Sequence, residues 1–175
     1  MKKTVILFML ASMAMCLQAQ TLKDRLCFQT KFVIGMPLPD SDVKPLSLTG
    51  FAEYKVHPRF STGLGTGLSK YDHLMIPVFA TLHWSITQPR QFTPFLACDI
   101  GHAFAPEKDV NGGFFLAPSI GVRYQLKGCQ SMTLSIGYEL QEYDQLKSHE
   151  SSFALSQYIE SISNYAITIG IGFTF

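Results

Sequence analysis

The chain has 175 residues, a formal net charge of +1 and 15% charged residues, whereas soluble domains average about 25%. This near-neutral charge excludes the basic surface that a nucleic-acid partner requires. Once an N-terminal export signal is removed, the length fits a single domain by the usual range of roughly 100–200 residues.

The N-terminal segment has the three parts of a secretory signal. Two lysines supply positive charge, an apolar stretch follows them, and Ala19 ends a small-residue cleavage site. The apolar stretch is too short to cross a bilayer as a retained helix. We therefore expect residues 1–19 to be cleaved and residues 20–175 to form the mature domain.

The mature sequence repeats a strand pattern in which large apolar residues alternate with small or polar ones. Because successive strand side chains point to opposite faces, each strand has one apolar face and one small, polar face. The C-terminal segment YAITIGIGFTF shows this most clearly, with Ile and Phe on one face and Ala, Thr and Gly on the other. In chain order, the expected strands span residues 25–36, 45–56, 60–69, 73–87, 92–105, 113–126, 131–143 and 165–175.

Tight turns and longer links alternate between these strands, with 70–72 as an exception. The tight turns are residues 57–59, 88–91 and 127–130. The longer links are residues 37–44, 106–112 and 144–163. A meander of this kind is typical of an outer-membrane barrel, whose strands need roughly 9–11 residues to cross a bilayer at a tilt. The sequence therefore predicts an all-β fold, an eight-stranded antiparallel up-and-down transmembrane β-barrel with both termini in the periplasm.

The placement of charge decides which face lies inside this barrel. Charged residues occur on the polar face, and each would cost about 2–4 kcal/mol near the bilayer midplane if it faced lipid. An apolar face of this size turned to water would far exceed the few hundred Å² that a soluble monomer tolerates. We therefore expect lipid outside and a polar network in the lumen, made of Lys31, Glu53, Lys55, Asp99, Arg123 and Glu139.

This set of charges also bears on whether the lumen is open. An eight-stranded barrel is just wide enough for side chains to fill it, and basic and acidic residues balance in the set. Since unpaired buried charges are costly, the balance favours a closed lumen over an ion-conducting constriction. The alternating glycines around Gly65 fit this interpretation, because they leave room for the inward rings of Phe51 and Phe79 and do not form a nucleotide-binding loop.

The C-terminal strand carries a further motif, in which Thr168 and Gly170 precede the aromatic residues Phe173 and Phe175. With this motif, the export signal and the strand spacing, the chain resembles the small outer-membrane β-barrel family of Gram-negative bacteria, of the outer-membrane-protein-A transmembrane type. The resemblance covers essentially the whole mature chain. It implies a porin-like barrel in the bacterial outer membrane, contact with outer-membrane lipid, and insertion by the barrel-assembly machinery through the motif as an assembly signal.

The expected function is structural or interactive, through the surface loops. The link 144–163 is the longest and carries several apolar residues, so it is the best candidate for contact with a surface partner. The alternative is a small channel or a lateral conduit for apolar solutes, because Pro77 and Pro118 interrupt two strands. A bulge at each proline is the simpler interpretation.

A second alternative is an enzyme that modifies lipids of the outer leaflet. His102 with Ser69, or the run Ser148-His149-Glu150, resembles the histidine and serine of such enzymes. Loop residues of this kind are more often only solvated, so we expect no catalytic residue, cofactor or metal site. A disulfide between Cys27 and Cys129, near turns at the same end, stays open.

Overall fold

The computed structural model describes residues 25–38, 44–71, 73–107, 110–126, 130–151 and 154–175, with backbone alone over 146–161. The predicted export signal and Cys129 lie outside the described residues. The signal and the Cys27–Cys129 disulfide therefore stay predictions.

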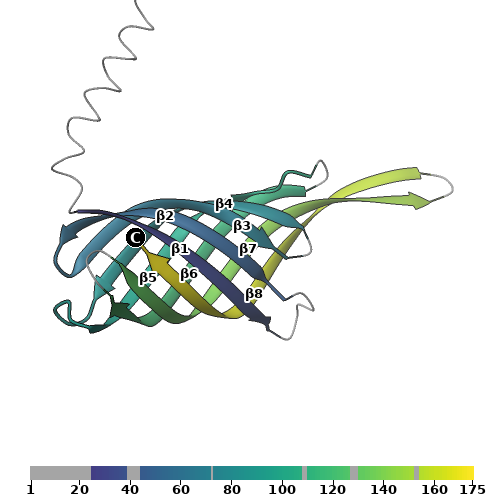
Figure 1. Ribbon diagram of the computed structural model, residues 1–175. Coiled ribbons are helices and arrows are strands. Elements are labelled where there is room, and N and C mark those ends of the chain that lie inside the picture. Colours follow the sequence, from purple (N-terminus) through teal and green to yellow (C-terminus); the bar gives the residue numbers. More distant parts are fainter. Residues whose placement is uncertain (1–24, 39–43, 72, 108–109, 127–129, 152–153) are drawn as a thin grey trace, which may run out of the picture.

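The described residues form a closed, antiparallel barrel of eight strands that follow one another around the wall in chain order (Figure 1). This confirms the predicted fold class. The first four strands are β1 (Leu26–Pro37), β2 (Leu46–His57), β3 (Phe60–Lys70) and β4 (Leu74–Ser85). The last four are β5 (Phe92–Phe104), β6 (Val110–Gln125), β7 (Ser131–Ser151) and β8 (Ala154–Thr174).

The barrel closes where β1 pairs with β8. Phe32 lies opposite Ile171 across this seam, and Lys31 lies opposite Gly172. At the end of the seam the backbone N–H of Phe175 donates to the carbonyl of Phe28 at 2.9 Å, and the N–H of Phe28 donates back at 3.2 Å. Closure pairs both edges of the sheet, so the wall has no free edge at this level.

The alternation of side chains separates the barrel into an apolar outer wall and a mixed interior. Outward residues of every strand are large and exposed, for example Leu64 at 72% and Ile136 at 57% relative exposure. Inward residues such as Met75 and Phe79 are buried. Because the inward positions are mainly small or polar, the strands curve tightly around them. The predicted assignment of the two faces is confirmed.

No helix among the described residues is long and apolar enough to cross a membrane.

The two ends of the barrel differ. At one end, the short-turn end, β2 is joined to β3 by residues 58–59, and the chain terminates at Phe175 (Figure 1). At the other, the hairpin end, β7 and β8 continue far beyond their neighbours as a two-stranded ribbon. Pairing runs from Gln145 opposite Glu160 to Ser151 opposite Ala154.

The predicted loop over 144–163 is therefore wrong as to its structure. Most of it is paired strand, and the connection itself is confined to residues 152–153. The apolar alternation used to bound the strands reports contact with lipid, and it weakens once the chain leaves the barrel wall. Beyond the barrel wall, backbone hydrogen bonds between β7 and β8 continue although the apolar alternation does not.

Candidate functional site in the barrel lumen

The lumen near the short-turn end contains a compact group of charged and polar side chains, here called the Arg123 cluster: Glu53, Ser61, His83 and Arg123. Oε1 of Glu53 lies 2.5 Å from Nδ1 of His83, and Oε2 lies 3.6 Å from Nη2 of Arg123. The hydroxyl of Ser61 donates to Oε2 at 3.0 Å. One buried carboxylate is thus surrounded by two basic side chains and a hydroxyl donor, which offsets the cost of removing its charge from water.

Neighbouring aromatic rings fix the geometry of the Arg123 cluster. The guanidinium of Arg123 lies over the ring of Phe95, 5.7 Å from the ring centroid. The imidazole of His83 contacts Phe95 and Phe51, with ring centroids 5.4 and 5.8 Å apart. Each of these residues occupies one of the alternate positions of its strand whose side chains point into the lumen. Regular alternation in four strands therefore brings the cluster together.

A second group lies deeper in the barrel and is called the Lys31 cluster: Lys31, Tyr71, Thr81, Asp99 and Glu139. Nζ of Lys31 lies 3.8 Å from Oδ2 of Asp99, and the hydroxyl of Thr81 donates to Oδ1 of Asp99 at 2.5 Å. The phenol of Tyr71 donates to Oε1 of Glu139 at 2.6 Å.

Tyr71 comes from the turn between β3 and β4, and its side chain is buried against the lumen. Burial and the neighbouring charge of Glu139 raise the pKa of its phenol above the usual value. The phenol therefore keeps its proton and acts as a fixed donor to the carboxylate.

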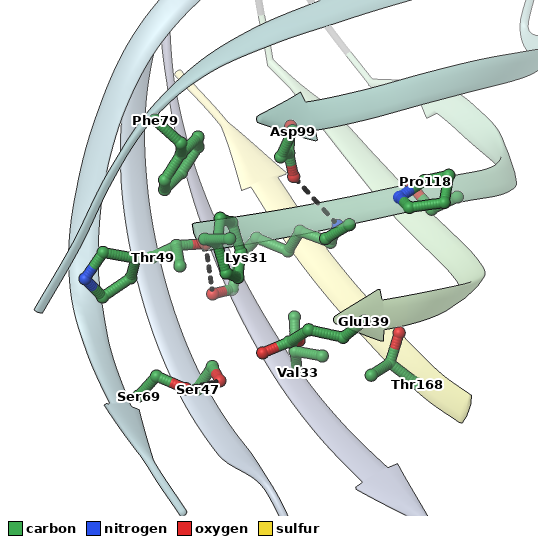
Figure 2. A pocket seen from close by; sticks show the side chains of 14 residues that line it. Lys31, Val33, Ser47, Thr49, Ser69, Phe79, Asp99, Pro118, Glu139 and Thr168 are labelled. Carbon is green, nitrogen blue, oxygen red and sulfur yellow. Dashed lines mark hydrogen bonds and ion pairs between the residues drawn. The ribbon is translucent and has the colours of Figure 1, made fainter. Parts of the chain in front are cut away.

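Three members of the Lys31 cluster line a cavity of about 20 Å³, and Figure 2 shows these residues, Lys31, Asp99 and Glu139, around it. This volume is close to the about 10–15 Å³ that one water requires. Phe79 and the Ser47–Ser69 hydroxyl pair, 2.6 Å apart, close it on other sides. Packed side chains thus leave space for about one water in this part of the lumen.

The alternating glycines of β3 make this packing possible. A Cβ added at Gly65 would lie 2.5 Å from Cβ of Phe51 and 2.7 Å from the ring of Phe79. The two rings themselves pack edge to face, with centroids 6.1 Å apart. The prediction that Gly65 leaves room for these inward rings is confirmed.

The structure brings most of the predicted lumen residues together but leaves one out. Five of them belong to the two clusters: Lys31, Glu53, Asp99, Arg123 and Glu139. Lys55 was expected in the same network and is instead exposed at the short-turn mouth. It follows Glu53 by two positions, so its side chain starts from the same face of β2, but it lies near the end of the strand, at the mouth of the barrel. That part of the prediction is wrong.

Four members of the clusters were not part of the predicted network: Ser61, Tyr71, Thr81 and His83. His83 lies at a position of β4 whose side chain points into the lumen. The alternation of the strand indicates this direction, although it does not reveal the contact with Glu53. Tyr71 lies in a turn, where the strand period carries no information about side-chain direction. The contact between Tyr71 and Glu139 depends on two elements 68 residues apart in sequence.

The predicted assembly motif lies on the seam strand β8. Phe173 and Phe175 point outward and their rings contact each other, with centroids 5.9 Å apart. Thr168 is buried and lines the cavity of the Lys31 cluster. Gly170 also faces inward, where an added Cβ would lie 2.9 Å from Cε of Lys31. This placement gives Thr168 and Gly170 a packing role in the lumen, and the assembly role of the motif stays a prediction.

The residues considered for catalysis do not form a site in the part of the chain that the structure describes. His102 lies on the outer wall beside Phe104, whereas Ser69 is buried inside and bonds to Ser47. The two side chains are therefore on opposite faces of the wall. The side chains of Ser148, His149 and Glu150 lie outside the described set. Among the described residues, no group of three or more His, Cys, Asp or Glu is placed to hold a metal ion.

The two prolines interrupt the ladder, but not through a bulge. On either side of Pro118 the β6–β7 pairs Leu116–Leu140 and Ser119–Gly137 keep the same register, and no pair joins β6 to β7 between them. At Pro77 the β3–β4 pairs likewise stop and resume in one register. The expected bulges are wrong, because a proline removes a hydrogen bond without inserting a residue. Both prolines line the cavity of the Lys31 cluster.

The fold defines a class, the closed antiparallel barrel found in bacterial outer-membrane proteins. No family model and no curated protein matches the sequence. Outer membrane protein OprG from Pseudomonas aeruginosa has a TM-score of 0.62 at 10% identity, over 86% of this chain and 96% of that one.

The N-terminal β-barrel domain of Pseudomonas aeruginosa OprF has a TM-score of 0.53 at 10% identity, over 87% of this chain and 98% of that one. Neisserial surface protein A has a TM-score of 0.50 at 11% identity, over 84% and 94%. At these identities the likeness shows a shared fold.

Proposed function

We propose that this protein is an integral outer-membrane barrel with a closed lumen, and that its hairpin acts at the cell surface as an interaction element. The observation that carries the proposal is the packed interior. The cavity at the Lys31 cluster has a volume of about 20 Å³, and the Arg123 cluster spans the lumen near the short-turn end. A hydrated ion needs a continuous water path, which such packing does not provide.

The membrane location is supported by the outer wall. Outward residues from all strands are large and apolar, and they include Phe28, Leu64, Trp84, Ile136 and Ile169. A contiguous apolar surface around a whole barrel is far larger than a soluble monomer exposes. The outer-membrane character of the structurally similar proteins agrees with this location. Insertion by the barrel-assembly machinery is part of the proposal and rests on the C-terminal motif.

The interaction role is supported by the hairpin of β7 and β8. The last pair between β6 and β7 is Val110 with Gln145. Beyond it, no strand among the described residues pairs with the edge of β7 that faces away from β8. On the other side, β1 accompanies β8 as far as Ala166. Among the described residues, no third strand pairs with residues 146–151 of β7 or 154–163 of β8, and a partner strand can bind such an open edge by extending the sheet. A two-stranded ribbon alone is marginally stable, so such a partner would also stabilise it.

Closure of the lumen is tested by single-channel recording of the refolded protein in planar bilayers. We expect no resolved conductance from the wild type. A variant that opens both clusters, with Lys31 and Glu139 of one and Glu53 and Arg123 of the other changed to alanine, is the positive control and should show conductance if it inserts. Steady conductance from the wild type would overturn the closed lumen.

The hairpin role is tested on intact cells with a photo-crosslinking amino acid at position 148, in the hairpin. We expect discrete crosslinked protein adducts from this position. The same amino acid at position 136, in the lipid-facing wall, is the matched control and should give none of these adducts. A variant with residues 147–158 replaced by an Asn-Gly turn should insert normally. If cells with wild-type protein give no adduct at position 148, the interaction role fails.

A second candidate function is a lateral conduit for apolar solutes. The supporting observation is that Pro118 is exposed on the outer wall and also lines the inner cavity, where the β6–β7 ladder is interrupted. Uptake of an apolar fluorophore into vesicles distinguishes this candidate. A disulfide at the edge of the gap, between cysteines introduced at positions 116 and 140, which pair across β6 and β7, should block uptake in a conduit and leave a closed barrel unaffected. We propose no catalytic function.

A further inference from the structure

A second hollow opens at the short-turn end and has a volume of about 180 Å³. This exceeds the about 10–15 Å³ that one water requires by more than tenfold. Its wall is formed by the ends of β2, β3, β4, β5 and β6, together with the β2–β3 turn. Residues with polar groups on this wall include Lys55, His57, Arg59, Ser61, Arg123 and Gln125.

The charge around this hollow has one sign. Lys55, Arg59 and Arg123 line it, and no aspartate or glutamate is among the described residues of the lining. Arg25 and Arg90 are exposed at the same end of the barrel. Glu53 lies beneath the lining and is already bound by the other members of the Arg123 cluster. The mouth therefore has a net positive potential that favours anions.

The side chain of Arg123 and the backbone of Arg59 are held in place. Arg123 is fixed between Glu53 and the ring of Phe95. The backbone of Arg59 is tied on both sides: its N–H donates to Nδ1 of His57 at 3.3 Å, and its carbonyl accepts from the N–H of Ser85 at 2.8 Å. A binding site built on fixed backbone loses less conformational entropy when a ligand arrives.

Arg123 also has donors to spare. A guanidinium carries five N–H groups, and both printed partners meet the same terminal nitrogen, Nη2: Nδ1 of His83 at 3.1 Å and the carboxylate of Glu53 at 3.6 Å. The Nε atom is buried, whereas the side chain as a whole is 18% exposed and lines the hollow. The side chain thus spans the wall between the buried carboxylate and the hollow, with capacity for another acceptor.

We infer that the hollow is a binding site for a phosphate-type oxyanion. Phosphate oxygens match the planar fork of arginine and the point charge of lysine, and this combination recurs in phosphate recognition. Two sources supply this chemistry at a membrane surface: free phosphate or phosphate esters, and the headgroup of an anionic phospholipid in the adjacent leaflet. The inference goes beyond the proposed function, because it concerns the opposite end of the barrel from the hairpin.

The test uses the full-length mature barrel and a matched pair of charge variants. In Lys55→Gln/Arg59→Gln, two cations are removed from the hollow. In Lys44→Gln/Lys70→Gln, two exposed cations are removed from the hairpin end, so the net charge changes equally. Heat-modifiability on gels confirms that each variant is folded. Arg123 is left intact, because its loss would also disturb the buried cluster.

In one arm, inorganic phosphate and glycerol 3-phosphate are titrated into the barrel in neutral detergent micelles, and heat is measured by calorimetry. In the other, native mass spectrometry counts phosphatidylglycerol retained after extraction from vesicles of phosphatidylcholine and phosphatidylglycerol. We expect the hollow variant to lose about tenfold in affinity, or its retained lipid, and the hairpin-end variant to match the wild type.

Each outcome has a defined meaning. Binding of the soluble phosphates alone identifies a free oxyanion as the source, and specific retention of phosphatidylglycerol identifies a headgroup. Equal losses in both variants would show non-specific attraction by net charge and overturn the site. Absence of binding by the wild type in both arms would overturn it as well. None of these results depends on whether the hairpin binds a partner.

Discussion

The Arg123 cluster and the Lys31 cluster close the same lumen in different ways. In the Arg123 cluster, a single carboxylate, Glu53, is surrounded by two basic side chains within 3.6 Å. In the Lys31 cluster, Asp99 pairs with the one lysine and accepts from Thr81, whereas Glu139 accepts from the neutral phenol of Tyr71. The first closure depends on charge pairing, and the second depends largely on hydroxyl groups.

The aromatic residues between the clusters explain how both fit in one barrel. Phe51 contacts His83 of the Arg123 cluster and also Phe79. Phe79 in turn lines the cavity of the Lys31 cluster. An apolar layer thus separates the two polar clusters. Each cluster must then be satisfied locally, because apolar packing offers no polar partner in between.

The largest expected effect is in the Arg123 cluster. Glu53→Leu removes the buried carboxylate that pairs with both His83 and Arg123, and leaves these two basic side chains facing each other at 3.1 Å. Breaking a buried pair from one side costs about 3–5 kcal/mol of unfolding free energy. Urea unfolding in micelles, followed by the fluorescence of Trp84, measures this loss.

The control for that variant is Lys55→Met at the exposed mouth. It should change the unfolding free energy by no more than about 0.5 kcal/mol, as surface substitutions do. Equal losses in Glu53→Leu and Lys55→Met would mean that the buried pairing does not stabilise the barrel.

The Lys31 cluster should be less sensitive, because its acceptors are satisfied by hydroxyl donors. Tyr71→Phe removes one hydrogen bond to a carboxylate, which corresponds to about 1.5–3 kcal/mol of unfolding free energy. Tyr138→Phe, on the outer wall beside Tyr165, is the matched control and should be near neutral. If the two variants are equally stable, the phenol does not support the cluster.

The apolar layer is tested by its glycine. In Gly65→Ala, the new methyl group would meet Phe51 and Phe79, and overpacking of this kind costs about 1–3 kcal/mol. Gly50 is the control, because a Cβ there meets no atom within 4 Å. The same unfolding assay should show a loss for Gly65→Ala and little change for Gly50→Ala. The reverse order would contradict the assigned faces.

Sequence reasoning succeeded where the period-2 rule applies. It placed Lys31, Glu53, Asp99, Arg123 and Glu139 inside and predicted the closed barrel, because a strand between lipid and a narrow lumen must alternate. It did not distinguish depth along a strand, so Lys55 was assigned to a buried network although it lies at the mouth.

The remaining errors have the same origin. Tyr71 comes from a turn, where no period predicts direction, and its partner Glu139 is identified by the three-dimensional arrangement alone. The hairpin lies above the wall, where the lipid that enforces alternation is absent and backbone pairing continues without it. At Pro77 and Pro118 the sequence marks a lost hydrogen bond, but it does not show that the register is unchanged.

The central claim is that the apolar wall faces lipid, and Trp84 tests it most directly. The sequence contains one tryptophan, and its side chain is outward and 52% exposed. Its fluorescence in vesicles can be quenched by lipids brominated on the acyl chains or by acrylamide in water. The account predicts strong quenching by the brominated lipids and weak quenching by acrylamide. Strong quenching by acrylamide with none by the brominated lipids would contradict it.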